Sequence, residues 1–183
     1  MSTWEGKNFE PMIRPRVVMR SAAVAFCALA LGVLPFRPGA VGAEEEPAVV
    51  ETRALSSQVA HAIALAAVQD CVKRGYKVAA AVVDRHGNLA AFLRDPLAGP
   101  HTIEISRSKA FTSATTQRST ASLSARTDLS FAPGMLLIVG GVPISFNGHF
   151  YGGVAVSGAT PEVDEKCAEA GLEAVADTMS FVE

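Results

Sequence analysis

Two apolar runs flank Arg85-His86-Gly87 in the sequence KVAAAVVDRHGNLAAFLRD, residues 77–95. Apolar strands joined by a short loop that ends in glycine are typical of a β-hairpin, because glycine readily takes the positive φ that such loops require. A second stretch, MLLIVGGVPISFNGHFYGGVAVSGA (135–159), contains Asn147-Gly148, the dipeptide most typical of a tight hairpin turn. Together the two stretches predict an antiparallel sheet.

The strands expected from this pattern cover residues 77–84, 88–94, 135–139, 142–146 and 149–157. The run Met135 to Val139 is apolar throughout, which predicts a strand that is buried on both faces. Asp84 ends the first strand, and its carboxylate is expected to accept hydrogen bonds from the loop amides that follow.

Helices are expected before, between and after the strands. Residues 101–115 carry apolar side chains at roughly helical spacing, and Thr160-Pro161 supplies a cap residue and a first-turn proline for a helix that reaches about Met179. Two further helices are expected at 55–74 and 120–126, the second capped by Thr120. The sequence therefore predicts the α+β class, with an antiparallel sheet of about five strands flanked by helices.

The N-terminal 43 residues have the three parts of an export signal. Basic residues at 14, 16 and 20 precede an apolar run at 21–34, and Val41-Gly42-Ala43 places small residues before a possible cleavage point. The apolar run is shorter than the roughly 20 residues that span a bilayer, so we expect cleavage and no stable membrane insertion. This divides the chain into a signal (1–43), a linker (44–53) and one domain (54–183), located in the periplasm or secreted.

Residues 44–183 hold 11 basic and 16 acidic side chains, a formal charge of −5. No basic patch stands out in this composition, so nucleic-acid binding is not expected. Cys71 and Cys167 fall on two different predicted helices, and in an oxidising compartment they could pair. Free buried cysteines are slightly favoured, because the sequence gives no constraint that brings the two together.

Four segments resemble the GlcG/HbpS-like family of secreted haem-binding proteins, whose fold also forms the C-terminal domain of PduO-type corrinoid adenosyltransferases. They are AVVDRHGNLAAFLRD (81–95), AGPHTIEISRSKAFTSA (98–114), GGVPI (140–144) and GGVAVSGATPEVDEKCAEAG (152–171). The resemblance implies a profilin-like fold, a homo-oligomer and a haem or iron-chelate ligand. It does not imply corrinoid chemistry, because the catalytic domain of those adenosyltransferases has no counterpart here.

His101 is the first candidate for a ligand contact. It lies at the start of the predicted helix after Pro100, and neutral imidazole is a common axial ligand of haem iron. Glu104 follows three positions later on the same helical face, where it could share a metal ion with His101 or orient the imidazole. The alternative is a helix-start histidine with a first-turn glutamate that favours the helix dipole.

Three further residues of this helix are candidates for cofactor binding. Arg107 and Lys109 could pair with haem propionates, although each is more commonly a solvated surface charge. Thr112 lies about two turns beyond Glu104, and the resemblance implicates a threonine, at 112 or 120, in haem contact. A hydroxyl bonded back to the preceding helical turn is the alternative for Thr112.

Three functional classes remain open from the sequence. The favoured one is an exported protein that binds haem or an iron chelate, with a role in haem or iron sensing, storage or handling. The second is an enzyme that acts on haem or on a small organic acid, with His101 and Glu104 as an acid–base pair. The third is an oligomeric accessory protein without a ligand.

Overall fold

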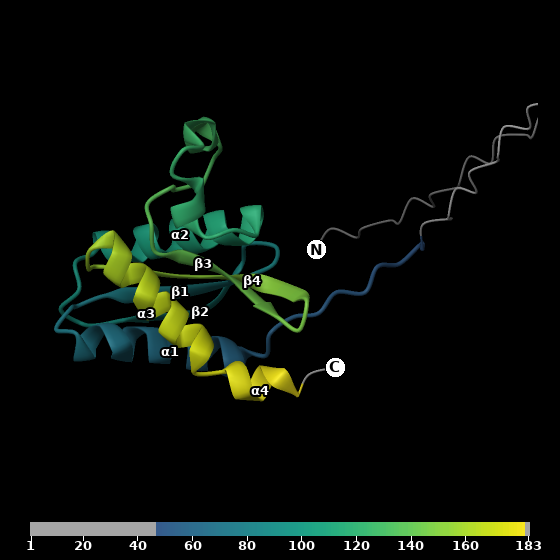
Figure 1. The fold of residues 1–183 in the computed structure, drawn as a ribbon, viewed down its shortest axis with the longest axis horizontal. Coiled ribbons are helices and arrows are strands. Elements are labelled where there is room, and N and C mark those ends of the chain that lie inside the picture. The colour runs from purple at the N-terminus through teal and green to yellow at the C-terminus, as the bar shows by residue number, and fades with distance from the viewer. Residues whose placement is uncertain (1–46, 182–183) are drawn as a thin grey trace, which may run out of the picture. The chain divides into compact units, whose positions relative to one another are not determined.

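The computed structural model describes residues 47–181, which form an α+β domain (Figure 1). The elements are α1 (Ser57–Lys73), β1 (Ala79–Asp84), β2 (Leu89–Arg94), α2 (His101–Thr116), the 3₁₀ helices η1 (Thr120–Leu123) and η2 (Thr127–Phe131), β3 (Gly141–Phe146), β4 (His149–Ser157), α3 (Pro161–Glu173) and α4 (Ala176–Ser180). The predicted fold class, an antiparallel sheet flanked by helices, is confirmed.

The sheet has four strands in the order β2-β1-β4-β3, and every neighbouring pair is antiparallel. Both predicted hairpins form, at β1–β2 and at β3–β4. The side chain of Asp84 accepts hydrogen bonds from the backbone amides of His86 (2.8 Å) and Asn88 (2.9 Å), as expected for a carboxylate that closes the first loop.

Successive residues of β1 point to opposite faces of the sheet, and all of Ala79–Val83 are buried. Ala80 and Val82 belong to a large apolar core between the sheet and the helices α1 and α3. Ala81 and Val83 face the other way and pack against two alanines of α2, Ala110 and Ala114. Figure 1 shows α2 on one face of the sheet and α1 and α3 on the other. α2 is therefore the one long helix on its side of the sheet among the described residues.

The strand predicted at Met135–Val139 is wrong. This segment is irregular and only partly buried, and Ile138 is 45% exposed. Its backbone groups pair with side chains of α2 instead of with a strand: the amide of Leu136 donates to Thr112 Oγ1, and the carbonyl of Val139 accepts from Lys109 Nζ. The apolar run therefore lines one side of α2 and does not add a fifth strand.

The last predicted helix is divided in two, since α3 ends at Glu173 and α4 begins at Ala176. The helix predicted at 120–126 is replaced by η1 and η2, and Ser119, not Thr120, is the cap of η1. The export signal predicted at 1–43 lies outside the described residues. Within residues 47–181 no helix combines the length and the apolar character that crossing a membrane requires.

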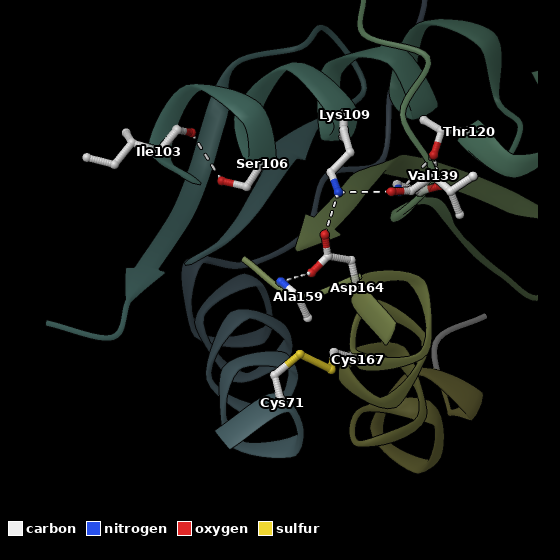
Figure 2. Close-up of polar contacts among 10 residues, drawn as sticks. Cys71, Ile103, Ser106, Lys109, Thr120, Val139, Ala159, Asp164 and Cys167 are labelled. Carbon is white, nitrogen blue, oxygen red and sulfur yellow. Dashed lines mark hydrogen bonds and ion pairs between the residues drawn. A yellow bond between two sulfur atoms is a disulfide. The ribbon is translucent and has the colours of Figure 1, made fainter. Parts of the chain in front are cut away.

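Cys71 of α1 and Cys167 of α3 form a disulfide, so the interpretation as two free cysteines is wrong (Figure 2). Both side chains are fully buried in the larger core. The predicted export made the pairing possible, but no local pattern could indicate it, because 96 residues separate the two cysteines. The packing of α1 against α3 brings them together, a tertiary contact that local spacing does not encode.

Candidate functional site

The helix α2 lies close to the sheet because small groups separate the two. A Cβ atom added at Gly153 of β4 would lie 2.4 Å from the carbonyl oxygen of Ala110 and 2.9 Å from the amide nitrogen of Ala114. Such distances leave no room for a side chain, so glycine at this position sets the depth of the helix. The buried face of α2 is held firmly, and its opposite face is presented to solvent.

The exposed face of α2 carries His101, Glu104 and Arg107, spaced three residues apart. Arg107 Nη1 lies 3.9 Å from Glu104 Oε2, and both side chains are more than half exposed. The imidazole of His101 lies over Gly99, where an added Cβ would be 2.5 Å from the imidazole Cε1 atom. Glycine at 99 therefore lets the ring fold back across the loop that precedes the helix.

A first hollow of about 240 Å³ lies along one side of this face. It is lined by Glu104, Arg107, Ser108 and Phe111, and closed by the glycines of the β1–β2 loop and of the Pro133-Gly134 turn. An added Cβ at Gly87 would be 2.6 Å from the Phe111 ring, so the first hairpin touches the aromatic side chain. The hollow combines an aromatic wall with a carboxylate and a guanidinium.

A second hollow, of about 220 Å³, lies on the other side of α2. His101, Ile105 and Lys109 line it from the helix, Ile138 from the irregular segment, and Asp164 from α3. His101 and Glu104 therefore border different hollows. Among the described residues, no three histidine, cysteine, aspartate or glutamate side chains gather into a group that could hold a metal ion.

Lys109 is not a surface charge, contrary to the interpretation favoured by the sequence. Its side chain is 1% exposed, and its Nζ donates hydrogen bonds to Asp164 Oδ2 and to the carbonyl of Val139, both at 2.9 Å (Figure 2). The other oxygen of Asp164 accepts from the amide of Ala159 at 3.0 Å. The ion pair thus ties α2 to α3 and to the irregular segment.

Burial acts on both members of this pair. Removal from water lowers the pKa of the Lys109 amine, against the attraction of Asp164. The same loss of hydration raises the pKa of the Asp164 carboxyl, against the attraction of Lys109. The two shifts run toward the neutral forms, as expected when desolvation outweighs the Coulomb attraction.

Sequence reasoning did not single out Asp164 as a partner for Lys109, although a signal was present. Asp164, Cys167, Ala168 and Gly171 follow the i, i+3, i+4, i+7 pattern of a buried helical face, and all four are buried. An aspartate on such a face requires a buried cation or several donors, because an unpaired buried carboxylate is very costly. The sequence pattern does not show which cation pairs with Asp164.

Thr112 is fully buried and its hydroxyl is already engaged. It donates to the carbonyl of Ser108 at 2.8 Å and accepts from the amide of Leu136 at 2.7 Å. The bond back to the preceding helical turn, which the sequence suggested as the alternative to ligand contact, is therefore present. The hydroxyl of Thr120 accepts from the amide of Gly141 at 3.0 Å, so the interpretation of Thr120 as a helix cap is wrong.

Residues 55–173 match the family described as "Haem degrading protein HbpS-like". The chain is 35% identical over 108 residues to protein GlcG of Escherichia coli, across 56% of this chain and 81% of GlcG. Its fold is similar to that of HbpS from Streptomyces reticuli, crystallised as a double mutant: the TM-score is 0.65 and the identity 34%, over 68% of this chain and 89% of HbpS.

A structure described as the PduOC:Heme complex is also similar, with a TM-score of 0.62 and 25% identity over 67% of this chain and 95% of that one. The region matched by the family includes both hairpins, α2 with the exposed residues described above, and the whole of α3. The chain therefore belongs to the HbpS-like family.

Proposed function

We propose that this protein binds haem, or a closely related iron chelate, against the exposed face of α2. One observation carries the proposal: in a chain of the HbpS-like family, an exposed imidazole, His101, stands at the start of this helix. Neutral imidazole is a common axial ligand of haem iron. A protein of similar fold, PduOC, has been crystallised with haem.

The residues present on this face fit such a ligand. His101 would supply the axial nitrogen, the guanidinium of Arg107 would pair with a propionate, and Phe111 offers an aromatic surface to the ring. Ile103 adds an exposed apolar side chain on the same helix. When bound, haem would supply redox chemistry and oxygen binding, whereas the protein's residues would set its orientation and its access to solvent.

Both hollows are smaller than the roughly 300–1,000 Å³ of a pocket that encloses a drug-sized ligand. Haem would therefore lie against the face of α2 and not inside a closed cavity. Lys109 and Thr112, which the sequence also put forward as haem contacts, are buried behind this face. We assign them a supporting role, since both hold the segment 135–139 beside α2.

Titration of the purified protein with haemin, followed at the Soret band, tests this proposal. We expect a saturable spectral change in the wild type, and weaker binding with a shifted Soret maximum in His101→Ala because an axial nitrogen is lost. His86→Ala is the matched control, since His86 is an exposed histidine at the tip of the first hairpin. Equal affinity and equal spectra in all three proteins would rule out His101 as the ligand.

Haem breakdown is the second candidate, and the description of the matched family favours it. His101 and Glu104 would be the groups available near the ligand, although they face different hollows. Adding a reductant to the haemin complex in air separates the two functions. A stable Soret band indicates a binding protein, whereas decay that requires the protein and is slower in His101→Ala indicates an enzyme.

We further propose that the protein is exported, in the periplasm or beyond. The basic, apolar and small-residue order of residues 14–43 supports export. The disulfide between Cys71 and Cys167 supports it independently, because disulfides persist in oxidising compartments. N-terminal sequencing of protein isolated from its native cells should give a terminus near Glu44, and an intact cytosolic Met1 terminus would contradict the proposal.

A homo-oligomeric state, which the family resemblance implies, is part of the same proposal. Phe131 and Leu97 are large apolar side chains that are 88% and 76% exposed in the single chain. Exposed side chains of this kind are common at contacts between subunits. Light scattering after gel filtration should give a mass that is a multiple of the chain mass, and a monomer at micromolar concentration would contradict this part.

A further inference from the structure

The second hollow beside α2 contains polar hydrogens that the described residues do not use. A lysine ammonium has three N–H donors, and Lys109 uses one for Asp164 and one for the carbonyl of Val139. No third acceptor for Lys109 is present among the described residues. Because Lys109 lines the hollow, an acceptor placed there would complete its hydrogen bonds.

Ser157 provides a second such group. It is only 4% exposed, lines the hollow, and its hydroxyl makes no hydrogen bond to a described residue. No fully enclosed side-chain nitrogen or oxygen of the described residues lacks a partner, so this hydroxyl must open onto the hollow. The hollow therefore offers two unused donors, from α2 and from the end of β4.

The walls around these donors indicate the size and character of a ligand. Ile105 and Ile138 are apolar, and His101 adds a polar edge next to Ile105. Pro161, the first residue of the 13-residue helix α3, also lines the hollow, and no side chain caps this helix. A helix N-terminus favours negative charge, which adds to the field of the Lys109 ammonium and partly offsets that of Asp164.

We propose that this hollow is a binding site for a small carboxylate of about two to four carbons. One carboxylate oxygen accepts from Lys109 Nζ, the other accepts from the Ser157 hydroxyl, and the short carbon chain lies against Ile105 and Ile138. A volume of about 220 Å³ suits such a molecule and excludes a haem ring. The site goes beyond the haem proposal, and the two share only His101.

An NMR titration of the oxidised protein without haem tests the site, with sodium acetate and then sodium pyruvate as probes and sodium chloride holding the ionic strength constant. We expect saturable shifts at the amides of Ser157, Gly158 and Ala159, and no such shifts at Gly148 on the far hairpin. Lys109→Met should weaken binding at least tenfold, since a charge-assisted hydrogen bond is lost. Lys77→Met is the matched control, because Lys77 forms a surface pair with Asp95.

Lys109→Met removes the partner of a buried carboxylate, so a second variant protects the test against misfolding. Ile138→Trp leaves the ion pair intact and fills the mouth of the hollow from a residue that is 45% exposed. Saturable binding that is lost in Ile138→Trp supports the site. Linear shifts without saturation, or the same affinity in Ile138→Trp, would mean a water-filled hollow only and would overturn the proposal. Haemin binding is measured separately, so failure of one proposal leaves the other standing.

Discussion

Lys109 and Asp164 are 55 residues apart in the chain, yet their side chains meet at 2.9 Å with almost no exposure to water. Breaking a buried pair by removing one partner is strongly destabilising, because the other charge stays buried alone. Replacing both partners by apolar groups avoids that penalty. Among single side-chain contacts, we therefore expect the loss of one partner of this pair to lower the free energy of unfolding most.

We expect Lys109→Met to lower the free energy of unfolding by about 3–5 kcal/mol, because Asp164 loses its cation. The double variant Lys109→Met with Asp164→Leu should recover a large part of this loss. Urea unfolding at neutral pH, followed by circular dichroism, measures all three proteins. A single variant as stable as the wild type would show that the ion pair is not formed in solution.

Asp84 gives a prediction for the dependence of stability on pH. Partial burial acts to raise the pKa of Asp84, but hydrogen bonds from Asn88 and His86 outweigh it and hold the pKa below the usual range. A carboxyl with a lowered pKa in the folded state contributes stability above its unfolded pKa of about 3.9, and this is lost as the pH falls through the folded value.

Asp84→Ala should therefore destabilise the protein at neutral pH by about 0.5–1.5 kcal/mol, the usual net contribution of a hydrogen bond, because water can replace the carboxylate at these exposed loop donors. Between pH 5 and pH 2 the variant should lose less stability than the wild type, because one titrating group has been removed. Thermal unfolding across this range measures the difference. Parallel stability curves for the two proteins would contradict the assignment.

At the same scale, the sequence predicted contacts within a few residues better than distant ones. The Asp84 loop bonds were expected, and the bond from Thr112 to its own helix was recognised as the alternative to ligand contact, since each donor lies within four residues of its acceptor. The partners of Lys109 and the second bond of Thr112 lie 24 to 55 residues away. Such contacts depend on how the elements pack, which no local pattern records.

At the scale of the elements, α1 and α3 pack side by side beneath the sheet and are joined by the disulfide (Figure 1). Cys167 lies one turn after Asp164 on α3. The same helix is therefore joined to α1 by the disulfide and to α2 by the ion pair. Removal of a native disulfide that closes a long loop typically costs 2–5 kcal/mol.

We expect the double variant Cys71→Ala with Cys167→Ala to lose about 2–5 kcal/mol of unfolding free energy relative to the oxidised wild type. The unfolding free energy of the reduced wild-type protein should fall toward that of the variant, because the reduced protein has lost the same disulfide. Guanidinium unfolding with and without dithiothreitol measures both effects. Identical midpoints for oxidised and reduced wild type would contradict a disulfide in the folded protein.

The helices and strands were largely predictable, apart from the division of the last helix, the 3₁₀ helices in place of the helix at 120–126, and the missing strand at Met135–Val139. Glycine turns, proline starts and apolar periodicity placed both hairpins and the long helices, because each of these signals acts within a single element. The run Met135–Val139 has the composition of a buried strand. Two of its backbone groups nevertheless form hydrogen bonds with the side chains of Lys109 and Thr112. Composition alone cannot show whether the backbone of an apolar segment will bond to a neighbouring strand or to side chains of a helix.

For the domain as a whole, one face of the sheet carries the larger core, and the other face carries the candidate ligand-binding helix. The larger core and the disulfide lie on the side of α1 and α3. The opposite side carries α2, whose exposed residues and two flanking hollows are the candidate ligand surfaces. This division predicts that variants on the exposed face of α2 change ligand binding with little effect on folding.

The position of the iron in a haemin complex tests the central claim most directly. Crystals grown with haemin, and an anomalous difference map recorded at the iron absorption edge, would locate the metal without assumptions about the ligand. We predict one iron peak beside the imidazole of His101 on the exposed face of α2. A peak beside His86 or His149 at the hairpin ends, or no ordered peak at saturating haemin, would contradict the account.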